Sequence, residues 1–192
     1  MNIKATNLGT GILLAALAVG MAGPAIAATF KPNVYYRLTT QFRGPGMCLD
    51  VYNEGEKNNL THLSQCGNYT GQYWNISWVQ SASDGTELYR LTTQFRGKSK
   101  CLDVVNGGPN DNHLILADCG NYSGQYWHLL PSGIVSGTFR LNSTFRAERC
   151  ADIFNGGPDN NDTNYAPCVN ASGQYWSVTP TDRAVPTDNQ TY

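Results

Sequence analysis

Three aspartates stand two residues after a cysteine at equivalent places along the chain: Asp50, Asp103 and Asp152. An ionised carboxylate offers several lone pairs and accepts two hydroxyl hydrogen bonds at once in a selective geometry. These residues are therefore candidate acceptors of hydrogen bonds from a ligand. The alternative is structural, because an Asp beside a strand often caps a turn. Both roles stay open at this point.

A second repeated motif, Gln-x-Trp, follows each aspartate, at Gln72–Trp74, Gln125–Trp127 and Gln174–Trp176. Residues two apart share one face of a strand, so each Gln points inward beside a core Trp. A buried amide needs hydrogen-bond partners, and each Gln therefore braces the backbone or the local Asp, or else contacts a ligand directly. Trp78 is expected to join the same core cluster.

These motifs lie in a unit that occurs three times. Each copy opens with a similar segment, at Tyr36–Gly44, Tyr89–Gly97 and Phe139–Arg146. The Gln-x-Trp motifs follow one another at spacings of 53 and 49 residues. Apolar and polar residues alternate within each copy, and Gly, Pro and Asn turns interrupt them. This pattern predicts about four short, half-buried strands per copy.

A unit of this size cannot bury both faces of its strands alone. We therefore predict one all-β domain over residues 28–180, in which repeats at about 35–80, 88–131 and 138–180 close around a shared core with three-fold pseudosymmetry. Residues 181–192 contain Pro186 and few apolar side chains. They are predicted to form a loose tail.

The six cysteines lie in pairs that are 18 residues apart within each copy. Fifteen pairings are available, and the repeat symmetry favours one bridge inside each copy. The favoured pairs are Cys48 with Cys66, Cys101 with Cys119, and Cys150 with Cys168. A zinc site is the alternative, but close Cys-x2-Cys spacing and a suitable His partner are lacking. We therefore expect no metal.

The first 27 residues have the pattern of a secretion signal. Lys4 is the one charged residue before Lys31, Gly11–Ala22 is apolar but too short to span a bilayer, and Ala25-Ile26-Ala27 suits cleavage before Ala28. We expect a secreted protein, or a periplasmic one in a bacterium, with no membrane span. The formal net charge of −1 disfavours a nucleic-acid partner.

The triple pattern of Cys-Leu-Asp-Val, Cys and Gln-x-Trp in units of about fifty residues resembles the ricin-type β-trefoil lectin modules. The resemblance covers nearly all of the chain after residue 27. It implies a six-stranded barrel capped by three hairpins, a disulfide inside each unit and one shallow sugar pocket per unit. In that family the Asp accepts sugar hydroxyls, an aromatic ring stacks on the sugar, and polar groups near Gln-x-Trp complete the pocket. The implied binding residues are Asp50, Gln72, Asp103, Gln125, Asp152 and Gln174.

The stacking ring of that family stands two residues before the second Cys, where this chain has Ser64, Ala117 and Ala166. Tyr69 and Tyr122 lie three residues after the second Cys and are the candidate replacements. The third copy has Ala171 there, so its site is expected to be weaker. Tyr165 lies at a strand position that alternation turns toward the core, and it is a poor replacement.

No motif assembles a nucleophile, an acid–base pair or a cofactor site, and a non-enzymatic protein is expected. His62, His113 and His128 do not correspond between copies and are expected at the surface. We predict a secreted lectin-like protein whose partners are glycans or glycoconjugates. The alternative is a trefoil scaffold with a protein partner, such as a toxin targeting subunit or a hydrolase inhibitor, which the missing stacking ring favours.

Overall fold

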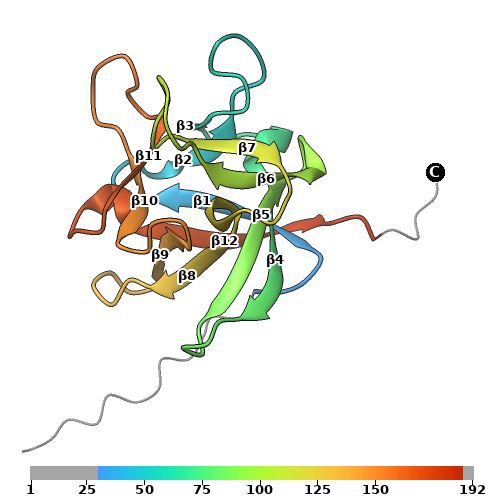
Figure 1. The fold of residues 1–192 in the computed structure, drawn as a ribbon. Helices are drawn as coiled ribbons and strands as arrows, with labels where there is room; N and C mark the ends of the chain where they lie inside the picture. Colours follow the sequence, from blue (N-terminus) through green and yellow to red (C-terminus); the bar gives the residue numbers. More distant parts are fainter. Residues whose placement is uncertain (1–29, 188–192) are drawn as a thin grey trace, which may run out of the picture.

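The computed structural model describes residues 30–187, whose twelve strands form three sets of four (Figure 1). The first set is β1 (Val34–Thr40), β2 (Gly44–Val51), β3 (Thr61–Gln65) and β4 (Trp74–Ser81). The second is β5 (Glu87–Thr93), β6 (Gly97–Val104), β7 (Leu114–Asp118) and β8 (Trp127–Pro131). The third is β9 (Thr138–Ser143), β10 (Arg149–Ile153), β11 (Thr163–Pro167) and β12 (Trp176–Ala184). The expected secretion signal lies outside the described residues.

The outer two strands of each set build a closed barrel. Strand β1 pairs with β4 and β12, β5 pairs with β4 and β8, and β9 pairs with β8 and β12, all antiparallel. The inner two strands of each set form a hairpin, and the three hairpins gather at one end of the barrel (Figure 1). This is a β-trefoil, as the sequence predicted, and closure leaves no exposed edge among its six barrel strands.

The three tryptophans of the Gln-x-Trp motifs anchor the hairpins to the core. Trp74, Trp127 and Trp176 are completely buried, as predicted. Each indole N–H donates at 2.9 Å to the carbonyl of the residue just before the aspartate, in Leu49, Leu102 and Ala151. The three predicted disulfides are present, one inside each repeat. These ties hold the backbone on which each Asp stands.

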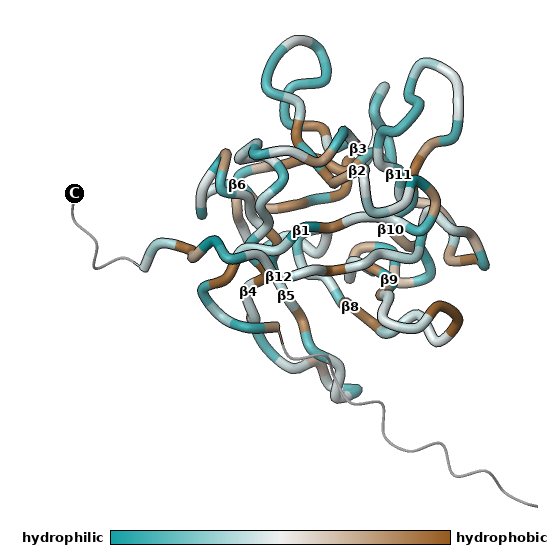
Figure 2. The backbone as a smooth tube through the Cα atoms, turned by 180° about the vertical axis from the view of Figure 1, so that it is seen from behind, coloured by the Kyte–Doolittle hydropathy of each residue, from teal (hydrophilic) through white to brown (hydrophobic). Residues whose placement is uncertain are grey.

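The hairpin tips are joined in a ring around the pseudo-three-fold axis. Asn59, Asn112 and Asn161 adopt positive φ angles of 68°, 66° and 73°, which Asn tolerates better than most residues. Their carbonyls accept backbone N–H groups of the next hairpin, from Leu116, Tyr165 and Leu63 respectively, at 2.7 to 2.9 Å. Beyond this ring the long hairpin loops are mostly hydrophilic (Figure 2). The hairpins therefore pack as one cap.

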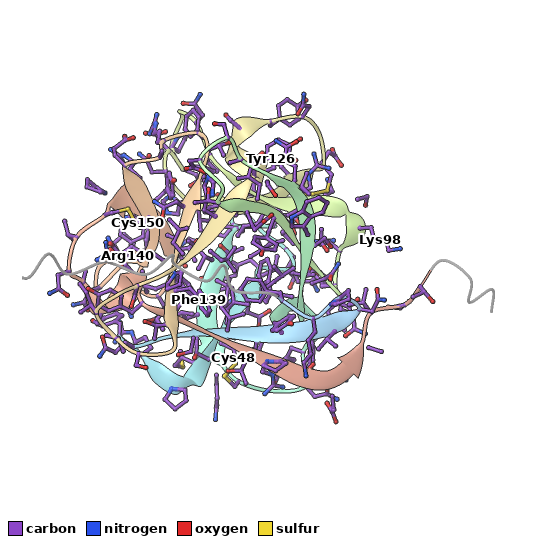
Figure 3. The ribbon with its side chains drawn as sticks, turned by 90° about the horizontal axis from the view of Figure 1, so that it is seen from below. Cys48, Lys98, Tyr126, Phe139, Arg140 and Cys150 are labelled. Carbon is purple, nitrogen blue, oxygen red and sulfur yellow. A yellow bond between two sulfur atoms is a disulfide. The ribbon has the colours of Figure 1, made fainter. Side chains whose placement is uncertain are left out.

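The opposite end of the barrel is closed by Phe30. Its ring lies 5.2 to 5.7 Å from those of Tyr36, Tyr89 and Phe139, which occupy equivalent positions in the three repeats. Figure 3 views this end, with Phe139 toward the middle of the barrel and Lys98 at the outside. Phe30, four residues before β1, is thus part of the packed domain.

Three expectations need correction. Strand β12 continues to Ala184 because it pairs with β1, and Val185 is buried, so residues 181–185 are not a loose tail. Trp78 is 62% exposed, because β4 extends past the barrel core before it reaches this residue. His113 is buried, because it stands in the cap where the three hairpins meet. Residues 188–192 lie outside the described range.

Candidate functional site

Each repeat holds its aspartate in the same way at the end of the first hairpin strand. Asp50, Asp103 and Asp152 are half-buried, and one carboxylate oxygen of each accepts the next residue's backbone N–H at 2.7 to 2.8 Å. Glycines pack directly against this oxygen. A Cβ atom at Gly71 or Gly124 would lie 2.2 or 2.0 Å from it, which no side chain could accommodate without moving the carboxylate. The chain therefore fixes each carboxylate in place.

The three glutamines lie behind the carboxylates. Gln72, Gln125 and Gln174 are completely buried, and each side-chain amide donates at 2.9 Å to the second oxygen of its local Asp. The same amides also donate to the backbone carbonyl of the residue before the second cysteine and accept the backbone N–H of the residue after it. These glutamines therefore brace the carboxylates, as one of the two sequence interpretations held. Full burial places them away from a ligand in solution.

The carboxylates differ in how much bonding capacity they keep. Asp50 also accepts the Ser64 hydroxyl at 2.8 Å, so it takes three hydrogen bonds. Asp103 and Asp152 take two, because alanine replaces serine at positions 117 and 166. Since a carboxylate offers about four lone-pair sites, two remain on Asp103 and one on Asp50. A pair of sugar hydroxyls would thus find both acceptors in the second repeat.

Shallow hollows open beside two of these carboxylates. The hollow of the first repeat has a volume of about 370 Å³ and is lined by Asp50, Asn68, Tyr69 and Phe95 among others. The hollow of the second repeat has about 400 Å³, and its corresponding residues are Asp103, Asn121, Tyr122 and Phe145. The tyrosines are 63% and 62% exposed. The structure therefore brings together the predicted Asp and Tyr of each of these repeats.

The phenylalanine in each hollow comes from the next repeat and was missed by sequence reasoning. Phe95 and Phe145 lie in the turns that connect the first two strands of the second and third repeats. An Arg guanidinium lies over each ring, with Arg96 4.1 Å from the Phe95 centroid and Arg146 4.6 Å from that of Phe145. Recurrence of Phe-Arg at a turn, where an apolar ring is unusual, was the available signal.

The tyrosine rings depend on a glycine two residues earlier. A Cβ atom at Gly67 would lie 2.4 Å from a ring carbon of Tyr69, and one at Gly120 would lie 2.4 Å from Tyr122. The ring therefore lies back over the glycine backbone. In the third repeat Val169 replaces the glycine and Ala171 the tyrosine. Both changes occur together, and the third repeat has no ring at this place.

A separate charged cluster ties the first hairpin to the third. The fully buried Asp162 accepts the Lys57 ammonium at 2.6 Å and the Tyr52 hydroxyl at 2.8 Å. Lys57 also contacts Asp159 at 3.0 Å. Bonding to these two carboxylates raises the Lys57 pKa, while burial and then the bond to Asp162 raise the Tyr52 pKa to about 12. The cluster thus favours a charged lysine beside a neutral tyrosine.

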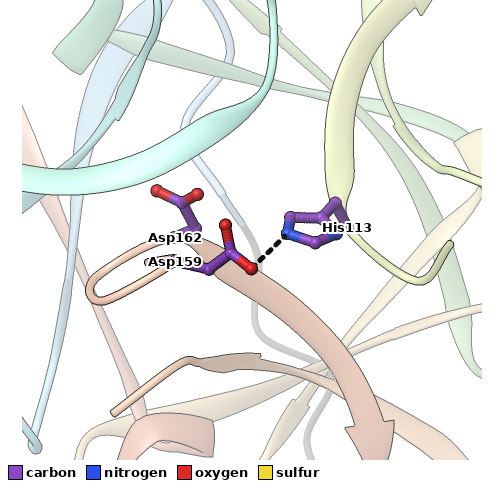
Figure 4. Close-up of side chains that lie close together, drawn as sticks. All are labelled: His113, Asp159 and Asp162. Carbon is purple, nitrogen blue, oxygen red and sulfur yellow. Dashed lines mark ion pairs between the residues drawn. The ribbon is translucent and has the colours of Figure 1, made fainter. Parts of the chain in front are cut away.

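His113, Asp159 and Asp162 lie close together in this cap, and all three side chains are of types that can bind a metal ion (Figure 4). Its Nε2 lies 4.0 Å from an Asp159 oxygen, and the ligand atoms of His113, Asp159 and Asp162 lie within 4.8 Å of one another. The Lys57 ammonium already bonds both carboxylates, so a metal ion would have to displace it. We assign the cluster a structural role.

Comparison with known proteins agrees with this geometry. The sequence profile of the ricin-type beta-trefoil lectin domain matches the chain over residues 35–134 and again over residues 87–191. Curated protein sequences give no significant match. In the described residues 30–187, no helix has the length and apolarity to cross a membrane.

Several solved structures share the fold. ThreeFoil, a designed three-fold symmetric protein, is 22% identical with a TM-score of 0.60, and the match covers 76% of this chain and 97% of that one. A Macrolepiota procera ricin B-like lectin in complex with lactose is 16% identical with a TM-score of 0.59, covering 79% and 99%. A mosquitocidal holotoxin is 14% identical with a TM-score of 0.64, covering 80% of this chain but 18% of the toxin. These similarities concern the fold.

Proposed function

Because the chain belongs to the ricin-type beta-trefoil lectin domain family, we propose that it binds carbohydrates in the hollows of its first two repeats. The observation that carries this proposal is the second hollow. There a fixed carboxylate with two unused acceptor sites lies beside the exposed Tyr122 ring and Phe145. Neighbouring sugar hydroxyls would donate to Asp103, and the apolar face of the sugar would pack on the ring.

The first hollow supports a similar site with one difference. Tyr69 and Phe95 supply the apolar walls, but the Ser64 hydroxyl takes one acceptor site of Asp50. We expect it to bind the same class of sugar more weakly. The third repeat keeps Asp152 and lacks the ring, and it should bind least.

Shallow sites of this kind hold a single sugar near millimolar concentration, or about −4 kcal/mol. Two sites on one rigid domain would act together on a surface that carries many copies of the glycan, and this raises the apparent affinity without new contacts. The proposed biological ligand is therefore a multivalent glycan or glycoconjugate.

We propose that the activity is binding without catalysis. Each of the two hollows contains a single carboxylate, whereas glycoside hydrolysis generally uses a pair. Those carboxylates already accept backbone and amide N–H groups.

We also propose that the protein is located outside the cytoplasm, and the three disulfides support this location. Determining the N-terminal residue of the exported protein would test cleavage before Ala28.

The direct test measures binding of the full chain to a glycan array and to lactose, with free sugar as competitor. Asp50→Asn together with Asp103→Asn should reduce binding at least tenfold, because the charge is lost while the side-chain shape is kept. The matched control is Asp152→Asn, which should change binding less than twofold, since the third repeat lacks the ring.

Binding that survives the double substitution would show that the ligand does not use these carboxylates. No binding to any glycan would contradict the lectin function and favour a protein-interaction scaffold. Near-ultraviolet circular dichroism of each variant would establish that the fold is unchanged.

A further inference from the structure

A further hollow lies away from all three aspartates, none of which lines it. It has a volume of about 620 Å³ and runs between the segment before β1, the β4–β5 pair and the β6 hairpin. Its lining includes Asn33, Asn75, Ser77, Trp78 and Lys98. We call this hollow the Trp78 groove. None of its lining residues belongs to the two hollows beside Asp50 and Asp103.

Trp78 has no counterpart in the other repeats. It stands four residues after Trp74, and the same position in the second and third repeats is Pro131 and Pro180. The four tryptophans also differ in exposure, since the three of the Gln-x-Trp motifs are completely buried and Trp78 is 62% exposed. An exposed indole is therefore a specific feature of the first repeat, and the core does not require it.

The indole is held in one orientation by its neighbours. Its N–H donates to the Glu87 carboxylate across the β4–β5 pair, and the Ser81 hydroxyl holds the same carboxylate at 3.1 Å. The strands pair Trp78 with Tyr89 at this point. A ring that is already fixed loses little conformational entropy when a ligand covers it.

Polar side chains line the same groove, and those of Asn75 and Ser77 point to the other face of β4 from Trp78. The Asn75 amide donates to the Ser77 hydroxyl at 2.9 Å. In the described structure this bond leaves the Asn75 carbonyl oxygen as an acceptor and the Ser77 hydroxyl as a donor. Asn33 adds a further amide at the groove wall. The groove thus combines one flat apolar surface with several hydrogen-bonding groups along it.

We propose that the Trp78 groove is a second kind of saccharide site, which stacks one ring of an oligosaccharide on Trp78 and bonds hydroxyls of its neighbouring units to polar side chains of the groove, among them Asn75 and Ser77 on the other face of β4. A pyranose has one apolar C–H face and a rim of hydroxyls, which is the complement of this arrangement. Sugars with equatorial hydroxyls, such as β-linked glucose and N-acetylglucosamine, present the widest apolar face. The inference extends the proposed carbohydrate binding but uses different residues.

Intrinsic fluorescence offers a selective readout, because Trp78 is the exposed indole among the four tryptophans. The probes are cellotetraose and chitotetraose, titrated into the full chain. At saturation with either probe, we expect a change in the emission and at least twofold protection of the exposed indole from acrylamide quenching. The response should persist in the Asp50→Asn, Asp103→Asn variant. No emission change and no protection with either probe would overturn the proposal.

Calorimetry with substituted chains separates stacking from other contacts. Trp78→Ala should weaken binding of the responding probe roughly tenfold, whereas Trp78→Phe should keep it within about threefold, because a ring remains. Equal affinity in Trp78→Ala and the wild-type chain would overturn the proposal even where the lectin function holds. If lactose binding is lost in the Asp50→Asn, Asp103→Asn variant and kept in the Trp78 variants, the groove and the aspartate sites bind independently. Equal melting temperatures would exclude misfolding, since the side chain is outside the core.

Discussion

The second and third repeats place the same carboxylate in the same frame and differ in what stands beside it. Asp103 and Asp152 each accept one backbone N–H and one glutamine amide, at distances that agree within 0.1 Å. The second repeat adds Tyr122 above Gly120, and the third has Ala171 and Val169 at these positions. The molecule therefore isolates the contribution of one aromatic ring to a site that is otherwise conserved in geometry.

The comparison teaches that the ring and its glycine act as a pair. A Cβ at position 120 would collide with Tyr122, and the third repeat, which has a side chain there, has no ring. The third repeat has instead a structural specialisation in the cap. Its Asp162 stands where the first two repeats have Leu60 and His113, and it receives Lys57 from the first hairpin.

The largest effect is expected from removing the lysine in that cap. Lys57→Met leaves the buried Asp162 with Tyr52 as its remaining side-chain donor. We expect the free energy of unfolding to fall by about 2 kcal/mol, less than for a fully buried pair because Lys57 is 36% exposed. Urea unfolding with the disulfides intact measures this.

The matched control for that substitution is Lys100→Met, which breaks an exposed pair with Asp118. It should change the free energy of unfolding by less than about 1 kcal/mol. Equal losses of unfolding free energy in the two variants would contradict the structural role assigned to the charged cluster around Asp162.

A smaller effect is expected from rebuilding the third site. Val169→Gly together with Ala171→Tyr recreates the pair found in the first two repeats. Binding to a glycan-coated surface should strengthen roughly fivefold, because the third repeat gains a ring beside its carboxylate. Surface plasmon resonance on immobilised lactose provides the measurement. Ala171→Tyr alone should gain less, since Val169 obstructs the ring, and an equal gain would refute the pairing.

The smallest effect concerns His62, which only the first repeat has opposite its Asp. Burial lowers the His62 pKa below its ordinary value, although Asp50 and Asp162 act in the opposite direction. The unfolded chain then binds a proton at a higher pH than the folded chain does. Stability should therefore fall as the pH drops below about 6.5. Melting temperatures at pH 7 and pH 5 should differ more for the wild-type chain than for His62→Asn, and identical differences would exclude this coupling.

The repeat pattern predicted most of the fold. Three in-phase copies of Cys, Asp, Cys and Gln-x-Trp indicated the trefoil, the disulfide pairs and the bracing of Asp50 by Gln72. Period-two alternation failed at Trp78, because it describes which face a residue occupies and not where the barrel core ends. Composition failed at Thr181–Ala184, because pairing with β1 orders a polar segment.

Parts of the site could not be predicted from one repeat at a time. Phe95 and Phe145 enter the hollow of the preceding repeat, and only the three-dimensional packing of neighbours reveals this. The positions where the family carries its stacking ring hold Ser64, Ala117 and Ala166, none of which is aromatic. The placement of Tyr69 beside Asp50 was a hypothesis that the geometry supports.

The most direct test follows individual amide groups during a sugar titration. The backbone N–H groups of Val51 and Val104 donate to Asp50 and Asp103, and that of Ile153 donates to Asp152 in the third repeat. In ¹⁵N-resolved NMR spectra with lactose, or with the tightest ligand from the array, Val104 should shift most, Val51 less and Ile153 least. Equal shifts at all three amides, or shifts at none while binding occurs, would contradict the account.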